Sequence, residues 1–176
     1  DRICAYTSLQ ALLKSSGEAT RLIFMADREE IGSEGATSAK SWFLLEVLEW
    51  LFGENPLKFL SNIKAVSADV TAAVNPNYKE VHDIKNAAFI NHGVVITKFT
   101  GSGGKYHGTE ATPEFVAWLR RIFNKHKVIW QASELGKVDE GGGGTVAKFL
   151  ASYNMDVVDI GPPLLSMHSP YEISGK

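Results

Sequence analysis

Apolar residues recur along the chain with two different periods, which predict helices alternating with strands. Apolar positions spaced three and four residues apart predict four helices. Gly17 is expected to end the first helix and Gly53 the second, while Thr112 and Pro113 begin the third as N-cap and first helical residue. The four helices are expected over residues 3–13, 36–52, 112–125 and 145–153.

The second of these helices is apolar almost all the way round. Between Trp42 and Phe52, only Glu46 and Glu49 interrupt the apolar residues. A helix that is apolar on every side is buried in a core or lies in an interface. Deep burial or an interface is therefore expected for this element.

Five short apolar runs bounded by turn residues favour buried strands, because each is too short for a typical helix. Strands are expected over residues 20–26, 63–70, 94–99, 128–131 and 157–160. Their alternation with helices predicts one α/β domain over residues 1–176. We expect a three-layer α/β/α arrangement, with helices on both faces of a mostly parallel or mixed sheet.

Unusual polar residues gather in loops that follow the predicted strands or lie close after them. Ligands of such folds bind at the carboxyl ends of the strands. We therefore expect these loops to converge at one edge of the sheet. The loops cover residues 27–30, 69–77, 137–145 and 166–169.

Composition excludes several classes of protein. The formal net charge is −2, which argues against a nucleic-acid binder. No apolar run reaches the roughly 18 residues of a membrane helix. The single cysteine, Cys4, excludes an internal disulfide and a cysteine-based zinc cluster, and a reducing cytoplasmic location fits it. The helical pattern opens at residue 1 without an initiator methionine, so we expect a piece of a longer chain.

Adjacent acids follow the first predicted strand at Glu29 and Glu30, and Asp69 ends another. A hydrolytic metal site needs a carboxylate ligand and a free carboxylate base, because the attacking water must lose a proton. Neighbouring residues point in different directions, so the two glutamates could divide these roles. A solvated turn remains the alternative for the glutamates, and a side-chain cap of the next turn for Asp69.

His168 lies between two serines after a Pro-Pro turn, which suits a core poorly. Imidazole is a common metal ligand, although an ordinary polar loop residue remains the alternative. Together, Glu30, Asp69 and His168 form a nitrogen and oxygen donor set. Such a set suits zinc, manganese or cobalt in a two-metal hydrolase better than a structural zinc site.

A run of four glycines at residues 141–144 precedes the last predicted helix. Gly144 and Thr145 lack the intervening lysine of a phosphate-binding P-loop, and the acids just before the run would repel a phosphate. Close approach of Gly143, Gly144 and Thr145 to a peptide substrate would explain the glycines. A tight structural turn is the alternative.

The order of four motifs resembles the aspartyl aminopeptidase (aminopeptidase I) family of dinuclear-zinc exopeptidases, whose bacterial-type members look closest. The first motif runs from Asp27 to Glu34, with Glu29-Glu30-Ile31-Gly32-Ser33 at its centre. The others are residues 67–69 followed by 75–78, residues 143–146, and residues 165–169. The resemblance extends from residue 1 to about residue 173 and implies the phosphorylase/hydrolase-like fold of these exopeptidases.

The resemblance also implies roles for individual residues. Glu29 matches the general base, Glu30 and His168 match ligands of one zinc, and Asp69 matches a ligand of the other. The family also uses an upstream histidine, which this sequence does not contain, and a bridging aspartate, which is either Asp1 or the residue before it. The implied cofactors are two divalent ions, most simply zinc, with cobalt or manganese as alternatives.

The resemblance implies further properties of the complete protein. Residues 1–176 would be the C-terminal part of the catalytic domain, with the remaining catalytic segment and a dimerisation domain upstream. The substrates would be peptides, the product of each cycle a released N-terminal residue, and the assembly a homo-oligomer, as large as a dodecamer. Departures from the eukaryotic pattern at Ala72, Asn75 and Thr97 leave the preferred N-terminal residue open.

Two other functions remain in view. A related two-metal amidohydrolase or deacylase would use the same residues on a non-peptide amide. A catalytically inactive assembly or binding protein of the same fold would not need the intact acids and histidine. A nucleotide-binding role for the glycine run is the least favoured.

Overall fold

A computed structural model describes residues 1–53 and 55–175. Its helices are α1 (Arg2–Lys14), α2 (Phe43–Phe52), α3 (Pro113–Lys125) and α4 (Ala147–Ala151). Its strands are β1 (Lys64–Ala68), β2 (Thr71–Ala72), β3 (Val94–Phe99), β4 (Trp130–Glu134), β5 (Asp156–Gly161), β6 (Pro163–Leu165) and β7 (Ile173–Ser174). Short 3₁₀ helices lie at Glu29–Ile31, Pro56–Lys58, Leu60–Asn62 and Lys79–Val81.

The central sheet is mixed, as the alternating pattern predicts. Its strand order is β1-β5-β3-β4. β1 runs parallel to β5 and β3 runs parallel to β4, whereas β3 and β5 are antiparallel. A smaller sheet of order β2-β6-β7 continues from the ends of β1 and β5. The prediction of an α/β fold is therefore confirmed.

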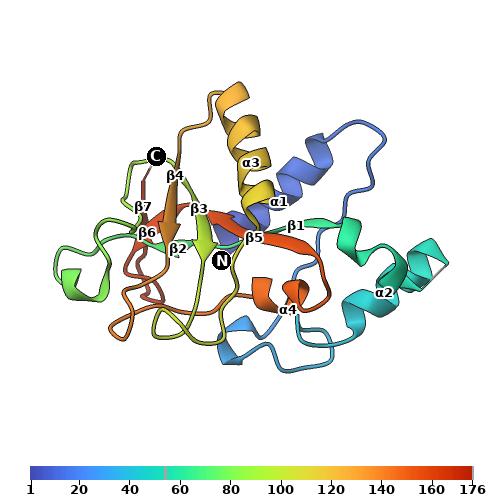
Figure 1. The fold of residues 1–176 in the computed structure, drawn as a ribbon, viewed down its shortest axis with the longest axis horizontal. Coiled ribbons are helices and arrows are strands. Elements are labelled where there is room, and N and C mark those ends of the chain that lie inside the picture. The colour runs from blue at the N-terminus through green and yellow to red at the C-terminus, as the bar shows by residue number, and fades with distance from the viewer. Residues whose placement is uncertain (54, 176) are drawn as a thin grey trace.

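Helices cover both faces of the central sheet, because successive residues of a strand point to opposite sides. On one face, Phe115 and Leu119 of α3 pack against Ile96 of β3 and Val158 of β5. On the other face, the next residue of β5, Asp159, meets the segment that leads into α4. Figure 1 shows α3 above the sheet and α4 below it.

The start of α3 is the local structure that the sequence specifies most fully. The Thr112 hydroxyl accepts a hydrogen bond from the Phe115 amide at 3.3 Å, and Pro113 occupies the first turn. Proline suits that position because its missing N–H would have had no helical partner. The N-cap and the first residue of this helix agree with the prediction, and Lys125 lies at its end as expected.

The predicted strand over residues 20–26 is wrong. This segment has no ladder pairing, and only Asp27 makes an isolated bridge, to Ser38. Its Phe24 side chain packs against the cluster of Leu44, Leu45 and Leu48. An apolar run indicates burial, but a strand also needs a neighbouring backbone to bond with, and the described residues offer none here.

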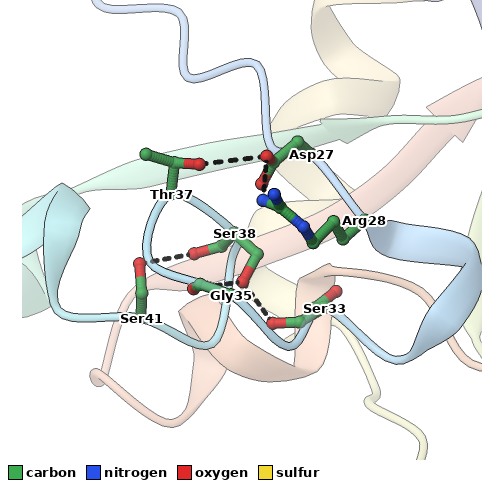
Figure 2. Close-up of polar contacts among 7 residues, drawn as sticks. All are labelled: Asp27, Arg28, Ser33, Gly35, Thr37, Ser38 and Ser41. Carbon is green, nitrogen blue, oxygen red and sulfur yellow. Dashed lines mark hydrogen bonds and ion pairs between the residues drawn. The ribbon is translucent and has the colours of Figure 1, made fainter.

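The second helix begins at Phe43, seven residues later than its apolar pattern predicts. Figure 2 shows the reason. The Ser38 hydroxyl donates to the carbonyls of Ser33 and Gly35, and the Ser41 hydroxyl donates to the Ser38 carbonyl at 2.8 Å. Serine side chains that bond to nearby backbone compete with helical hydrogen bonds, so they hold residues 33–41 in a compact loop.

The expectation of burial for the second helix holds for one side only. Leu44, Leu45 and Leu48 are buried, whereas Trp50 is 84% exposed and Leu51 54% exposed. The exposed side lies outside the core of the described residues.

Other differences lie at element boundaries. α1 ends at Lys14, before Gly17, because Ser15 already has extended backbone and caps the Leu12 carbonyl. α4 covers only the middle of residues 145–153, and β4 begins two residues later than expected. β6 begins at Pro163, the second proline of the predicted Pro-Pro turn, because parallel pairing with β2 extends the chain there.

The described residues contain no helix with both the length and the apolar character that a membrane crossing requires.

Candidate functional site

A cleft of about 1240 Å³ opens beyond the carboxyl ends of β1 and β5. Every one of the four polar loops named from the sequence contributes to its walls. Their contributions include Glu29, Asp69, Gly143 and His168. The convergence expected from the fold class is thus confirmed.

A tight loop holds Glu29 and Glu30 at the cleft. Arg28 has left-handed backbone with φ of 56°, and Gly32 closes the short helix with φ of 98°. The amides of Gly32 and Ser33 donate to the carbonyls of Glu29 and Arg28, at 3.0 and 2.8 Å. Arg28 also pairs with Asp27, which accepts from the Thr37 hydroxyl at 3.0 Å (Figure 2). These bonds fix the backbone and leave both glutamate side chains free for the cleft.

His168 lies beside Glu30, although the two are far apart in the sequence. Its Nδ1 atom is 3.5 Å from Oε1 of Glu30. The backbone there is left-handed, with φ of 67°, and the His168 amide donates to Oε1 of Glu172 at 2.8 Å. Glu172 therefore fixes the loop that carries the imidazole. Both side chains of the pair are about two thirds exposed, so a ligand can reach them.

Asp69 lies deeper in the same cleft. Burial, followed by the charges of Asp159 and Glu29, raises the pKa of Asp69 to about 7. The carboxyl group thus sits where negative charge is already concentrated. A bound cation would relieve this repulsion.

Glu29 shares that environment. Its pKa is raised, first by burial and then by the charge of Glu30, while His168 and Lys148 act in the opposite direction. A carboxylate with a raised pKa is a better proton acceptor than an exposed one. Glu29 therefore has the electrostatic setting of a general base.

The donor atoms present fit part of a metal site. Within residues 1–53 and 55–175, no group of three or more histidine, cysteine, aspartate or glutamate side chains is arranged to hold an ion. The Glu30 and His168 pair and the Asp69 carboxylate line the same cleft. Nitrogen and oxygen donors of this kind can ligate a divalent ion whose remaining ligands come from elsewhere in the protein.

The glycines of residues 141–144 differ in how much space a side chain would find at each position. A Cβ on Gly141 would lie 2.4 Å from the Val81 carbonyl oxygen, and one on Gly142 would lie 2.4 Å from the Gly101 carbonyl oxygen. Backbone packing alone therefore requires both glycines. A Cβ on Gly143 would meet only Leu135, at 3.7 Å, which is an ordinary contact. Packing does not explain Gly143, which lines the open cleft.

Thr145 differs from the glycines before it. Its hydroxyl donates to Oδ2 of Asp159 at 3.0 Å and accepts from the Ala147 amide at 3.3 Å. The side chain is buried, so the hydroxyl is engaged away from the cleft. Any contact of Thr145 with a ligand would come from its backbone.

Sequence reasoning missed Asp159, which is 4% exposed in the middle of β5. The signal for it was present, since one acid interrupts the apolar strand Val157 to Ile160. His82 and Lys148, which line the cleft, carried no comparable signal. Asp1 also lines the cleft, and its carboxylate caps α1 by accepting from the Cys4 amide.

Comparison with known proteins supplies independent information. The family described as aminopeptidase I zinc metalloprotease (M18) matches residues 1–176. A probable M18 family aminopeptidase 1 from Thermotoga maritima is 50% identical over 184 residues, covering 100% of this chain. A protein of the same description from Clostridium acetobutylicum is 46% identical over 184 residues.

Solved structures agree with these sequence matches. The crystal structure of an M18 family aminopeptidase from Thermotoga maritima aligns with a TM-score of 0.93 at 49% identity, covering 99% of this chain. That of aminopeptidase I from Clostridium acetobutylicum aligns with a TM-score of 0.83 at 45% identity. This chain spans about two fifths of these relatives, 41% of the Thermotoga maritima sequence and 39% of the Clostridium acetobutylicum structure.

Proposed function

Because this chain belongs to the aminopeptidase I zinc metalloprotease family, we propose that it supplies part of the catalytic centre of a metal-dependent aminopeptidase. The complete enzyme would remove N-terminal residues from peptides. The observation that carries the proposal is the meeting of His168 with Glu30 at 3.5 Å, in the cleft that also holds Glu29 and Asp69. A hydrolase that acts through two metal ions needs this combination of nitrogen and oxygen ligands with a separate acid.

Glu30 and His168 would hold one divalent ion, and Asp69 would hold the other. Zinc is the expected metal, with cobalt and manganese as alternatives for the same donor types. When bound, the two ions would polarise the scissile carbonyl and lower the pKa of a water molecule. The remaining ligands would come from the rest of the protein, with Asp1 or the residue before it as the bridging aspartate.

Glu29 would take the proton from the attacking water and return it to the leaving amine. Two features support this role. Its pKa is raised by burial and by Glu30, and its neighbour Glu30 rather than Glu29 contacts His168. Of the two adjacent acids, Glu29 would thus act as the base and Glu30 as a metal ligand.

Gly143, Gly144 and the backbone of Thr145 would form one wall of the substrate cleft. Space supports this assignment at Gly143, which close packing does not require, whereas a Cβ on Gly144 would lie 3.3 Å from the His107 carbonyl oxygen. A missing side chain at these positions leaves room for a peptide to approach the main chain.

Properties of the complete protein follow as proposals. Residues 1–176 would be the C-terminal part of the catalytic domain, with the rest of that domain and a dimerisation domain elsewhere in the protein. The exposed apolar side of α2 supports a homo-oligomer. A cytoplasmic location remains a prediction from the single cysteine.

The decisive experiment replaces Glu29 with Gln in the full-length protein. The Glu29→Gln variant should bind the same amount of metal while kcat for a peptide substrate falls by about 10²–10⁴, the usual share of a general base. Glu34→Gln is the matched control, because Glu34 is an exposed acid of the same loop, paired with Lys40. It should leave turnover unchanged.

Near-normal turnover in Glu29→Gln with metal bound would refute the assignment of the base. Activity of the unmodified enzyme on acylated amines, and none on peptides, would instead favour a related amidohydrolase or deacylase. An absence of both metal and activity would favour an assembly or binding protein.

A further inference from the structure

Four polar side chains form a buried row across the central sheet. Ser67 of β1 pairs in register with Asp159 of β5, which pairs with Thr97 of β3, which pairs with Ser133 of β4. Residues paired in this way project from the same face of a sheet. None of the four is more than 4% exposed. The row therefore crosses all four strands on the side that faces the segment before α4.

Asp159 is the charged member of this row, and it connects the sheet to the cleft. Its Oδ2 atom accepts from the Thr145 hydroxyl at 3.0 Å, and Thr145 Oγ1 accepts from the Ala147 amide at 3.3 Å. One carboxylate thus fixes the residue that ends the glycine run, and through it the first turn of α4.

The glycine run needs such an anchor, because glycines have no side chains with which to hold their own position. At one point the Gly143 carbonyl accepts from the Gly101 amide at 2.7 Å. Immediately after the run, Thr145 provides the side-chain bond to Asp159. The wall of the cleft at Gly143 and Gly144 is therefore held between a backbone bond on one side and Asp159 on the other.

Burying the Asp159 carboxyl group costs folding free energy, and packing alone does not explain why an acid occupies this position. Asp159 Oδ1 and Ser67 Oγ have no hydrogen bond of good geometry, although the Ser67 hydroxyl lies close enough to lower the pKa of Asp159. Burial still raises that pKa to about 6, and Asp159 in turn disfavours charge on Asp69. An apolar residue at this position would avoid these penalties.

We propose that Asp159 is a positioning residue, which sets the location of the Gly143–Gly144 wall through the Thr145 hydroxyl and so controls how tightly a peptide substrate binds. The inference rests on the proposed aminopeptidase function. In this arrangement the Thr145 hydroxyl bonds to Asp159 of the sheet and does not contact the substrate.

The test uses the full-length protein and five variants. Thr145→Val removes the hydroxyl with little change in shape, Asp159→Ala removes its acceptor, and the third variant combines both. Ser133→Ala is the control, because it deletes an equally buried hydroxyl from the far end of the row. Thr145→Ser, which retains the hydroxyl, tests rescue.

Each of the first two variants should raise KM for a peptide substrate about tenfold while kcat changes less than about threefold, as for the loss of one well-placed hydrogen bond. The double variant should show the same increase as either single variant, because the two residues act as one unit. Ser133→Ala should leave KM unchanged, and Thr145→Ser should recover most of the increase seen in Thr145→Val.

Hydrogen exchange provides a readout that does not depend on activity. The amide of Ala147 should exchange about tenfold faster in both Thr145→Val and Asp159→Ala than in the unmodified protein, because the first variant loses the acceptor and the second loses the carboxylate that holds it. If the unmodified protein has no peptidase activity, the proposed function fails while this measurement still judges the positioning role. Unchanged exchange in Asp159→Ala would overturn the inference. Additive KM effects in the double variant, or an equal KM effect in Ser133→Ala, would do the same.

Discussion

Neighbouring glycines in the run of four differ in whether the fold requires them. Gly142 has φ of +110° and a neighbouring carbonyl oxygen in the place of a side chain, so the fold requires it. Gly143 has neither constraint, and it borders the cleft. Stability and binding are therefore separable within two adjacent residues.

Substituting these two glycines with alanine should separate the effects. Gly142→Ala should lower the free energy of unfolding by about 2–4 kcal/mol, because it combines left-handed strain with overpacking. Gly143→Ala should cost less than about 1 kcal/mol but raise KM for a peptide several-fold. Denaturant unfolding and steady-state kinetics on the full-length protein measure both. A stable Gly142→Ala protein would contradict the packing explanation.

Replacing His168 tests directly whether this residue is a metal ligand. His168→Asn in the full-length protein should weaken binding of one metal ion by at least about tenfold, because a nitrogen ligand is lost. Metal analysis after dialysis against a graded chelator series would measure the loss. His126→Asn, at the exposed end of α3, serves as control and should retain full metal content. Equal retention in both variants would remove His168 from the ligand set.

Helices in this chain begin where side chains satisfy their first amides, and apolar spacing alone does not locate that point. For α3, the threonine cap and the proline agree with the apolar stripe, so the boundary is predicted correctly. For α2, the hydroxyls of Ser38 and Ser41 donate to nearby carbonyls (Figure 2), and the helix begins only at Phe43. Local hydrogen-bond competition therefore decides where an apolar segment becomes helical.

The cap of α3 should be worth a measurable amount of stability. Thr112→Ala should lower the free energy of unfolding by about 1–2 kcal/mol, since it removes the bond to the Phe115 amide. The loss also includes the bond that the Thr112 hydroxyl donates to Asp156 at 3.2 Å. Thr112→Ser should keep both bonds and lose less than half as much. Equal losses in the two variants, measured by denaturant unfolding, would show that the threonine methyl group matters instead.

On the scale of the whole molecule, the described residues leave apolar surface uncovered on one side of α2. Trp42, Trp50 and Leu57 are each about 70% exposed or more. Apolar surface of this kind marks an interaction site. A second subunit is the occupant that the proposed homo-oligomer would supply.

Trp50→Glu should therefore reduce the assembly size of the full-length protein, because a charge would be buried at the subunit contact. Light scattering would measure the mass, and circular dichroism would check that folding is retained. Ile129→Glu is the control, since Ile129 is also strongly exposed but lies beside β4. An unchanged mass in Trp50→Glu would contradict the assignment of this side of α2 to a subunit contact.

The sequence by itself determined the fold class, the four strands of the central sheet and the loops that line the cleft. Apolar periodicity and turn residues report local preference and burial, which is why β3 and α3 match their predicted ranges. Only the tertiary structure decided that residues 20–26 form no strand, because pairing depends on a partner elsewhere in the chain. The tertiary structure also decided that Asp159 holds Thr145 and that Glu30 meets His168. Contacts between distant segments arise from folding in three dimensions, and no local pattern of residues encodes them.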